Sequence, residues 1–397
     1  MTKISKLDKI IKPSGTMLIS NKARELREAG KPVIGFGAGE PDFASPDYVV
    51  SAAIEAANDP KNHKYSPTAG LESLRKSIAN SAHLNSNYLV DPANIVVTNG
   101  GKQAILTALM SLLDSDDEVI IPSPFWTTYP EAVLLAGGKP IFIETSKEKD
   151  FKISIEDLES IKTEKTKVLI WCSPSNPTGV VYTKEEAEEI YQWVFENDLW
   201  ILSDELYEHL VYEGEATPSP ALFDKDFNNT LIVNGVSKAY AMTGWRVGWL
   251  IANNQVINLA KKILSQATSN VNNISQLAAE AAINNGLEVT QKMKIAFDRR
   301  RRFAIEKINS IANISTTKAT GAFYLFVNVS HYCSGLIENV KSSEDFCNWL
   351  LEKYYIAFVP GEVFGAPGYM RLSYALSDDE LSEGLNRLEK AIKDISG

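Results

Sequence analysis

Five short apolar runs constrain the fold of this 397-residue chain more than any other feature of its sequence. Each run is apolar at successive positions, which predicts a strand that is buried on both faces, and helical patterns lie between most of the runs. This alternation is typical of α/β proteins in which helices cover both faces of a mainly parallel sheet. Trp245 to Ala252 is expected to add a further strand. The five runs are residues 95–97, 118–121, 167–171, 200–202 and 231–233.

The pattern changes after about residue 253 and predicts a second, smaller α+β domain. Helical periodicity continues through a basic run, Arg299–Arg302, which is expected to form a solvated helix face. Strands are expected at 322–327 and 369–373, and the capping box Ser377-x-x-Glu380 predicts a last helix. A chain of this length favours about two or three domains. The expected division is an N-terminal arm at 1–15, a small domain from 16–45 with 300–397, and a large domain at 46–299.

The segments before and between the apolar runs contain further helices and one turn of interest. A short strand is expected at 32–36, and it leads into a turn, Gly37–Asp42, whose glycines allow either a plain tight turn or a close approach of the backbone to a ligand. The capping box Thr183-x-x-Glu186 predicts the start of a helix. Other helices are expected at 21–29, 48–57 and 71–82.

Composition and charge exclude several classes of protein. A hydrophobic content of 44% and a charged content of 23% are typical of soluble globular proteins. The 40 basic and 50 acidic residues give a net charge of −10, which argues against a general nucleic-acid or membrane-surface binder. No apolar run approaches the roughly 18 residues that span a bilayer, and the first residues lack a signal-peptide core. The odd number of cysteines is typical of reduced core thiols, so a cytoplasmic protein is expected. Three cysteines and four scattered histidines show no metal-ligand spacing, so no metal is expected.

Small or polar residues follow each of the five apolar runs. In an open parallel sheet, ligands bind beyond the carboxyl ends of the strands. In chain order, the runs are followed by a glycine turn that opens a helix, an aromatic ring, an amide, a carboxylate with a tyrosine, and a lysine. If the sheet forms as expected, these groups converge on one crevice. They are Gly100–Gly101, Trp126, Asn176, Asp204 with Tyr207, and Lys238.

Each group has an ordinary explanation by itself, but together they fit one ligand. The glycines at a helix start, Gly100–Gly101, offer backbone N–H groups to a phosphate, although glycine turns are common. Trp126 can stack on a flat ring or fill a core, and Asp204 can pair with a protonated ring nitrogen or cap a helix. Lys238 can form an imine with an aldehyde, whereas most lysines are surface charges. A phosphate, a flat protonatable ring and an aldehyde together describe pyridoxal 5′-phosphate.

Three motifs in order make the chain resemble the pyridoxal-phosphate aminotransferases of the aspartate aminotransferase family, class I and fold type I. The motifs are Ser173–Gly179, Ser203–Tyr207 and Ser237–Arg246, and the resemblance runs from about Lys12 to the last helix. It implies transamination between amino acids and 2-oxo acids by a homodimer whose active sites are shared across the interface. One position departs from the pattern, because many relatives carry Ser where this chain has Gly235, and this leaves one phosphate contact in doubt.

The resemblance implies a role for each matching residue around the cofactor. Lys238 would hold the cofactor and move the proton, and Asp204 would pair with the pyridine nitrogen. Asn176 and Tyr207 would hydrogen-bond the ring hydroxyl, and Trp126 would stack on the ring. The catalytic set is therefore Lys238, Asp204 and Tyr207. The residues expected around the phosphate are Gly101, Lys102, Gln103, Ser237 and Arg246, with Tyr65 reaching the phosphate of the partner subunit.

The same resemblance implies the substrate contacts. Arg371 would grip the α-carboxylate, while Lys102 and Thr16, with Ser14 as a further candidate, stand where thermophile-type bacterial aspartate aminotransferases hold the side-chain carboxylate. The expected reaction is therefore L-aspartate with 2-oxoglutarate to give oxaloacetate and L-glutamate. Lys12 lies near enough in sequence to suggest prephenate as an alternative, bulkier dicarboxylate. The residues expected at the substrate are Gly39, Trp126, Asn176, Arg371, Thr16, Lys102 and Lys12.

Two other classes of function remain open at this point. A β-lyase or decarboxylase on the same cofactor would release pyruvate or carbon dioxide without an oxo-acid partner. A ligand-sensing domain of a transcription regulator would share the fold, but such proteins carry an N-terminal DNA-binding module, and the resemblance here already starts near residue 12. The expected partners are small amino and oxo acids and a second copy of the chain, with no nucleic acid and no membrane.

Overall fold

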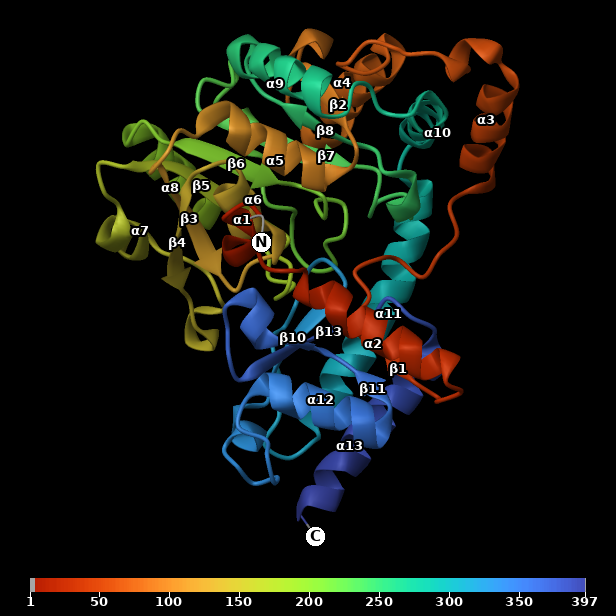
Figure 1. Ribbon diagram of the computed structural model, residues 1–397, viewed down its shortest axis with the longest axis vertical. Coiled ribbons are helices and arrows are strands. Elements are labelled where there is room, and N and C mark those ends of the chain that lie inside the picture. Colours follow the sequence, from red (N-terminus) through yellow and green to blue (C-terminus); the bar gives the residue numbers. More distant parts are fainter. Residues whose placement is uncertain (1–3, 397) are drawn as a thin grey trace.

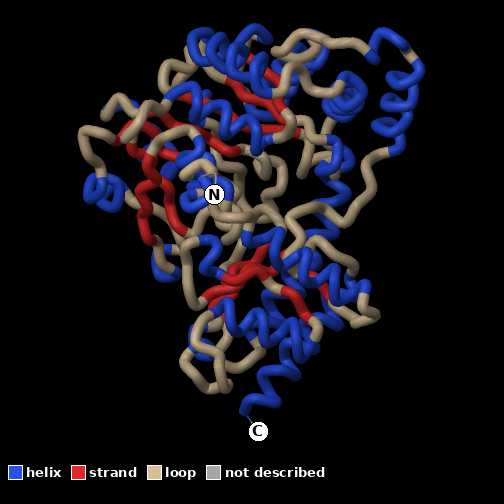
Figure 2. The backbone as a smooth tube through the Cα atoms, in the orientation of Figure 1, coloured by secondary structure: helices blue, strands red, loops and turns tan. Residues whose placement is uncertain are grey.

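The computed structural model describes residues 4–396, which form two lobes connected by the long helix α11, Glu288–Asn309 (Figure 1). Figure 2 shows that the strands gather in two groups, one in each lobe. The larger lobe holds the expected parallel sheet, and the smaller lobe holds the C-terminal strands. The first three residues of the expected arm lie outside the described residues.

Within residues 4–396, seven strands form the large sheet, in the order β2–β8–β7–β6–β5–β3–β4. Strand β8 is antiparallel to both of its neighbours, and every other adjacent pair is parallel. Strand β2 therefore points the same way as β7, so all five expected strands end at the same edge. The strands are β2 Ile95–Thr98, β3 Glu118–Ser123, β4 Lys139–Glu144, β5 Thr166–Cys172, β6 Trp200–Asp204, β7 Thr230–Gly235 and β8 Gly248–Ile251.

Helices cover both faces of this sheet, which confirms the predicted α/β class (Figure 1). Successive strand residues face opposite sides, so Leu169 packs with α7 and α8, whereas Ile170 packs with α5, α6 and α9. Helix α8 begins with the predicted capping box at Thr183. No helix in the described part of the chain is long and apolar enough to cross a bilayer. The helices of this lobe are α3 Asp47–Asn58, α4 Glu72–Ser86, α5 Gly101–Leu112, α6 Thr128–Leu135, α7 Ile155–Ile161, α8 Lys184–Glu196, α9 Asn254–Ala267 and α10 Asn273–Asn284.

The smaller lobe is built on a four-stranded antiparallel sheet, β12–β13–β10–β9, with a separate parallel pair, β1–β11. Its main core also contains Tyr207 and Leu210, which follow strand β6 of the large sheet, so the predicted domain boundaries stay a prediction. The strands are β1 Ile34–Gly35, β9 Ser315–Thr316, β10 Tyr324–Asn328, β11 Ile356–Ala357, β12 Val359–Pro360 and β13 Tyr369–Ser373. The remaining helices are α1 Leu7–Ile10, α2 Gly15–Glu28, α12 Ser343–Tyr354 and α13 Asp378–Ser396.

Among the elements that differ from the sequence prediction, α2 and β4 have clear physical reasons. Helix α2 begins at Gly15, not at Asn21. The glycine at its start is required by close packing, because a Cβ there would lie 2.4 Å from Val363 Cγ1. This glycine therefore does not mark a turn. Strand β4 was not predicted, because it lies at the edge of the sheet and its side chains are mostly exposed or half-buried, so it lacks a continuous apolar run.

The expected solvated face at Arg299–Arg302 is wrong for its two middle residues. Arg300 is 8% exposed and Arg301 is 2% exposed, and both lie on the buried side of α11. Buried guanidinium groups are tolerated where carboxylates compensate their charge. The partners are Asp42 and Asp378 for Arg300, and Asp298 and Glu213 for Arg301.

Candidate active site

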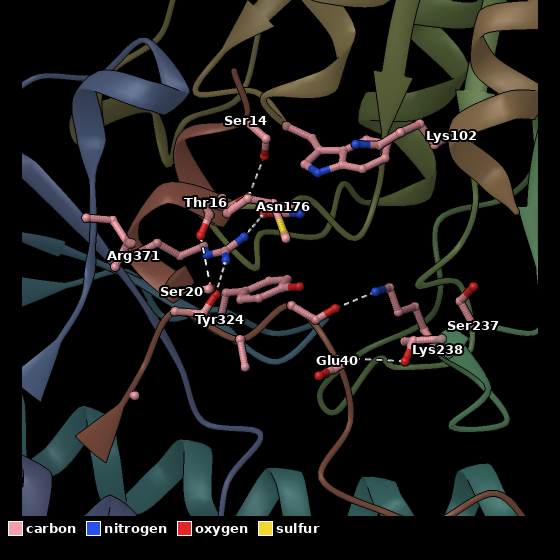
Figure 3. A pocket seen from close by; sticks show the side chains of 18 of the residues that line it. Ser14, Thr16, Ser20, Glu40, Lys102, Asn176, Ser237, Lys238, Tyr324 and Arg371 are labelled. Carbon is pink, nitrogen blue, oxygen red and sulfur yellow. Dashed lines mark hydrogen bonds between the residues drawn. The ribbon is translucent and has the colours of Figure 1, made fainter. Parts of the chain in front are cut away.

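A cavity of about 650 Å³ opens at the carboxyl edge of the large sheet, and residues of both lobes line it (Figure 3). It lies where parallel strands β5, β6 and β7 end, as the sequence predicted. No three His, Cys, Asp or Glu side chains within residues 4–396 gather as a metal site requires. The expected site residues that line the cavity are Thr16, Gly39, Gly101, Lys102, Trp126, Asn176, Asp204, Tyr207, Ser237, Lys238, Arg246 and Arg371.

Asp204 is the last residue of β6, and its carboxylate is buried at the floor of the cavity. The Tyr129 hydroxyl donates to its Oδ2 at 2.7 Å, and the Leu206 N–H donates to its Oδ1 at 3.3 Å. Burial raises the pKa of Asp204 to about 6, although the Tyr129 hydrogen bond opposes this rise. These hydrogen-bond donors are neutral, so the carboxylate is suited to pair with a cation inside the cavity.

Lys238 follows β7, and its ammonium donates to the Gly39 carbonyl at 2.5 Å. Burial is the largest cause that lowers the pKa of Lys238, to about 8, and the positive charge of Arg371 lowers it further. The negative charges of Glu40 and Asp204 act in the opposite direction. A lysine with this pKa holds a useful fraction of neutral amine near pH 7, as a nucleophile or a base requires.

An anion site is formed where the glycine turn opens helix α5. Gly100 has φ of +79°, and a Cβ there would lie 2.4 Å from Arg246 Nη2. Only glycine therefore allows the guanidinium to lie over the start of the helix. The Arg246 side chain is held by hydrogen bonds to the carbonyls of Thr243, at 2.9 Å, and Asn99, at 3.2 Å. With Ser237 on the same cavity, this arrangement suits a phosphate.

The structure also explains the glycine that departs from the family pattern. Gly235 on β7 pairs with Gly248 on β8. A Cβ at position 235 would lie 2.9 Å from the Val247 oxygen and 3.0 Å from the Gly248 Cα. A serine here would therefore require the two strands to move apart.

Arg371 on β13 is 2% exposed and has no acidic partner in the described chain. It donates to Asn176 Oδ1 and to the Gly37 carbonyl, both at 2.9 Å, and its buried Nε has no hydrogen-bond acceptor (Figure 3). Its guanidinium carbon lies 4.4 Å from the centroid of the Tyr324 ring. Burial lowers the pKa of Arg371, since no carboxylate compensates the charge. A buried cation of this kind calls for an anionic ligand.

A second cation reaches the cavity from another side. The Lys102 ammonium lies 5.5 Å from the centroid of the Trp126 ring, and burial followed by the charge of Arg246 lowers its pKa. The hydroxyls of Ser14 and Thr16 are 3.0 Å apart at the start of α2 and line the same cavity. Figure 3 shows Lys102 and Arg371 approaching from different sides.

Three expected site residues do not line the cavity. The Gln103 side chain accepts a hydrogen bond from the Asn99 N–H at 2.7 Å and is directed to other partners. Tyr65 is 90% exposed. Lys12 is exposed and lines a neighbouring cleft, where its backbone N–H donates to Glu131 Oε2 at 3.0 Å. The roles expected for Gln103, Tyr65 and Lys12 stay predictions.

Sequence reasoning missed two tyrosines of the site. Tyr129 lies three residues after Trp126, with the two ring centroids 5.6 Å apart, so helical spacing could have indicated it. Tyr324 lies two residues before Phe326, which is paired with Arg371 across strands β10 and β13. It is therefore a diagonal neighbour of Arg371 on one face of the sheet. A tyrosine in a buried strand needs a partner for its hydroxyl, and this was the available signal.

Comparison with known proteins agrees with this geometry. Residues 31–388 match the model of a family described as aminotransferase class I and II. The chain is 47% identical to an aspartate aminotransferase of Streptomyces avermitilis, over 97% of this chain and 95% of that protein. It is 43% identical to a probable aspartate/prephenate aminotransferase of Aquifex aeolicus, over 97% of each. The structure of Thermus thermophilus aspartate aminotransferase with maleate matches with a TM-score of 0.92 and 37% identity, covering 98% of this chain and 100% of that one. The chain therefore belongs to the class I and II aminotransferase family.

Proposed function

We propose that this aminotransferase moves the amino group of L-aspartate to 2-oxoglutarate. The observation that carries the proposal is a pair of cations on one cavity, Arg371 and Lys102, of which Arg371 has no acidic partner in the part of the chain that the structure describes. A dicarboxylate can place one carboxylate at each cation, whereas a substrate with one carboxylate leaves the exposed Lys102 without an ion-pair partner. The names of the Streptomyces and Thermus proteins support this substrate class.

Proteins of this family use pyridoxal 5′-phosphate, and the cavity has the features that fit it. The start of α5 is open because a Cβ at Gly100 would fill the space beside Arg246, which leaves an anion cradle. Asp204 is a buried carboxylate with neutral hydrogen-bond donors, and Lys238 is a half-buried amine on the same cavity. When bound, the cofactor supplies an electron-withdrawing ring that stabilises negative charge at the substrate Cα.

The residues of the chain then have distinct tasks. Asp204 keeps a proton on the ring nitrogen, because its negative charge favours the protonated form. Lys238 carries the proton from the substrate Cα, which its pKa of about 8 permits near neutral pH. Arg371 orients the α-carboxylate, with Gly39 beside it, and Lys102 with Thr16 holds the side-chain carboxylate. The other residues assigned to the cofactor are Trp126, Asn176 and Tyr207 at the ring, and Gly101, Lys102, Gln103, Ser237 and Arg246 at the phosphate.

The proposal includes a homodimer. Tyr65 is 90% exposed and does not line the cavity of its own chain, which supports a role across an interface, at the phosphate of a partner subunit. A Tyr65→Phe variant should bind the cofactor more weakly while remaining a dimer in sedimentation experiments. A chain that sediments as a monomer with full cofactor affinity would contradict this part.

A second candidate substrate is prephenate. A cleft of about 560 Å³ adjoins the main cavity, and Lys12, Ser14 and Lys102 line it together with apolar side chains. This space could take the ring of a bulkier dicarboxylate, and the name of the Aquifex relative includes prephenate.

Steady-state kinetics of the cofactor-loaded protein tests both candidates. Aspartate, glutamate, phenylalanine and alanine are each paired with 2-oxoglutarate, oxaloacetate and prephenate. The proposal predicts that aspartate with 2-oxoglutarate is used most efficiently, and a Lys238→Ala variant serves as the inactive control. Similar efficiencies for alanine and aspartate would contradict the two-cation argument. Prephenate turnover equal to that of 2-oxoglutarate would favour the second candidate.

A further inference from the structure

The hydroxyl groups of Tyr207 and Tyr324 are hydrogen-bonded to each other in the cavity wall, with their oxygens 2.8 Å apart. Tyr207 follows β6 in the larger lobe, Tyr324 begins β10 in the smaller lobe, and both line the cavity. Only one of the two hydroxyls can donate to the other. If Tyr207 accepts, its own hydrogen stays available to a ligand in the cavity. If Tyr207 donates to Tyr324, that hydrogen is already used.

The surroundings of the two rings favour Tyr324 as the donor. The Arg371 guanidinium carbon lies 4.4 Å from the centroid of the Tyr324 ring, and Figure 3 shows the ring beside the Arg371 side chain. A positive charge beside a phenol stabilises the phenolate and makes its hydroxyl a stronger donor.

The pKa directions of the two hydroxyls agree with this assignment. Burial raises the pKa of Tyr324, and Arg371 is the next largest influence and lowers it. Burial holds the pKa of Tyr207 well above its usual value, Tyr324 raises it further, and Arg371 is a smaller influence that lowers it. The cation nearest the Tyr207 ring, Lys238, lies 5.8 Å from its centroid, farther than Arg371 lies from Tyr324. The other charged or titratable groups that face this pair are Lys238, Asp204, Cys172 and Glu40.

We propose that Tyr324 is a positioning residue for the aminotransferase reaction, with separate tasks for its hydroxyl and its ring. The hydroxyl donates to Tyr207, so that Tyr207 keeps its own hydrogen for the cofactor's ring oxygen. The ring supports the Arg371 guanidinium beneath the substrate carboxylate. This inference rests on the proposed role of Tyr207, and it links the cofactor side of the cavity to the carboxylate side.

Two substitutions separate the tasks of the hydroxyl and the ring. Tyr324→Phe removes the hydroxyl and keeps the ring on Arg371, whereas Tyr324→Leu removes both. Tyr332→Phe is a matched control, because Tyr332 is also buried in the smaller lobe, donates to the Ala312 carbonyl at 2.8 Å, and does not line the cavity. Thermal unfolding and circular dichroism establish that each variant is folded.

The first measurement is the pH titration of the cofactor's visible absorbance in the loaded protein without substrate. A weaker donor at Tyr207 stabilises the negatively charged ring oxygen less, so Tyr324→Phe should raise the pH midpoint by roughly half a unit to one unit. Tyr207→Phe should raise the midpoint further, and Tyr332→Phe should not change it. If Tyr207→Phe shifts the midpoint and Tyr324→Phe does not, the inference is wrong and the proposed function stands. If neither shifts it, the role of Tyr207 in the proposed function is wrong as well.

The second measurement is the affinity of the loaded protein for maleate, an unreactive dicarboxylate. Tyr324→Phe should stay within about twofold of the native protein, because the cation–ring contact remains. Tyr324→Leu should bind maleate roughly three- to thirtyfold more weakly, because that contact is lost. Equal and large losses in both variants would contradict the separate role of the ring.

Discussion

Arg371 and the pair Arg300 and Arg301 are all buried guanidinium groups, but their surroundings differ. On helix α11, Arg300 donates to Asp42 at 2.9 Å and Arg301 donates to Asp298 at 2.7 Å, so each charge meets a carboxylate. Arg371 meets an amide, a backbone carbonyl and aromatic rings, none of which carries a negative charge. The charges on α11 are compensated within the chain, whereas the charge of Arg371 is left for a ligand in the proposed function.

The comparison shows that the partners of a buried arginine distinguish one that stabilises the fold from one that is suited to bind a ligand. A buried charge costs free energy unless an opposite charge or several hydrogen bonds compensate it. At α11 the compensation comes from within the chain, so those arginines stabilise the fold. At Arg371 it is incomplete, because Nε has no acceptor, and the rings of Tyr324 and Phe364 hold the group without neutralising it. In the proposed function, a substrate carboxylate supplies the missing negative charge.

The largest effect is expected from Arg371→Leu. Loss of the carboxylate partner should cost about 2–5 kcal/mol of transition-state stabilisation for every amino donor. This corresponds to a fall in kcat/KM of roughly thirty- to several-thousandfold. The free energy of unfolding of the cofactor-free protein should not fall, because an uncompensated buried charge is removed. Steady-state kinetics and denaturant unfolding measure the two quantities. A clear loss of stability would break the comparison.

The reverse outcome is expected for Arg301→Leu. The free energy of unfolding should fall by about 2–3 kcal/mol, because Asp298 and Glu213 lose a buried partner. The KM for aspartate should stay within about twofold, since the residue is not part of the cavity. Arg302→Leu is the control: it also pairs with Asp298 but is 68% exposed, and it should change the free energy of unfolding by less than about 0.5 kcal/mol. Equal losses of unfolding free energy in Arg301→Leu and Arg302→Leu would show that burial of the guanidinium does not determine its contribution to stability.

Lys102→Ala sharpens the comparison at the second cation of the cavity. The ammonium is partly solvated and already contacts Trp126, so its loss should reduce kcat/KM for aspartate by only about tenfold. Alanine has no side-chain carboxylate and should be affected much less. Kinetics with both donors measures the difference. Equal losses would assign Lys102 to the phosphate or to the fold.

The smallest expected effect concerns pH alone and tests another cation of the cavity, the half-buried Lys238. Its pKa is lowered to about 8, so the amine is neutral above that pH and charged below it. Because only a neutral amine attacks an aldehyde, the rate at which cofactor-free protein takes up cofactor should rise with pH up to about 8 and then level off. Stopped-flow absorbance measures this rate. A midpoint near 10.5, the usual lysine value, would show that Lys238 is solvated.

The sequence predicted those parts of the molecule that depend on local pattern. Strands buried on both faces have continuous apolar runs, and their parallel order brings Asp204 and Lys238 to one edge. Features that depend on distant pairing were not predicted. The burial of Arg300 requires Asp42 from far along the chain, and the contact between Tyr324 and Arg371 requires the register of β10 against β13. No local pattern contains that information.

Helix α11 has a mechanical consequence for the active site. It has 22 residues, which makes it about 33 Å long, and it runs between the two lobes (Figure 1). Near its start, Thr290 donates to the carbonyl of Ala239, the residue after Lys238. Farther along, Arg300 pairs with Asp42, and Arg301 donates to the carbonyls of Lys318 and Ala319, so both arginines bind the helix to the smaller lobe. A continuous helix is stiff, so it acts as a lever. A rotation of the smaller lobe would therefore be transmitted along this helix to the backbone beside Lys238.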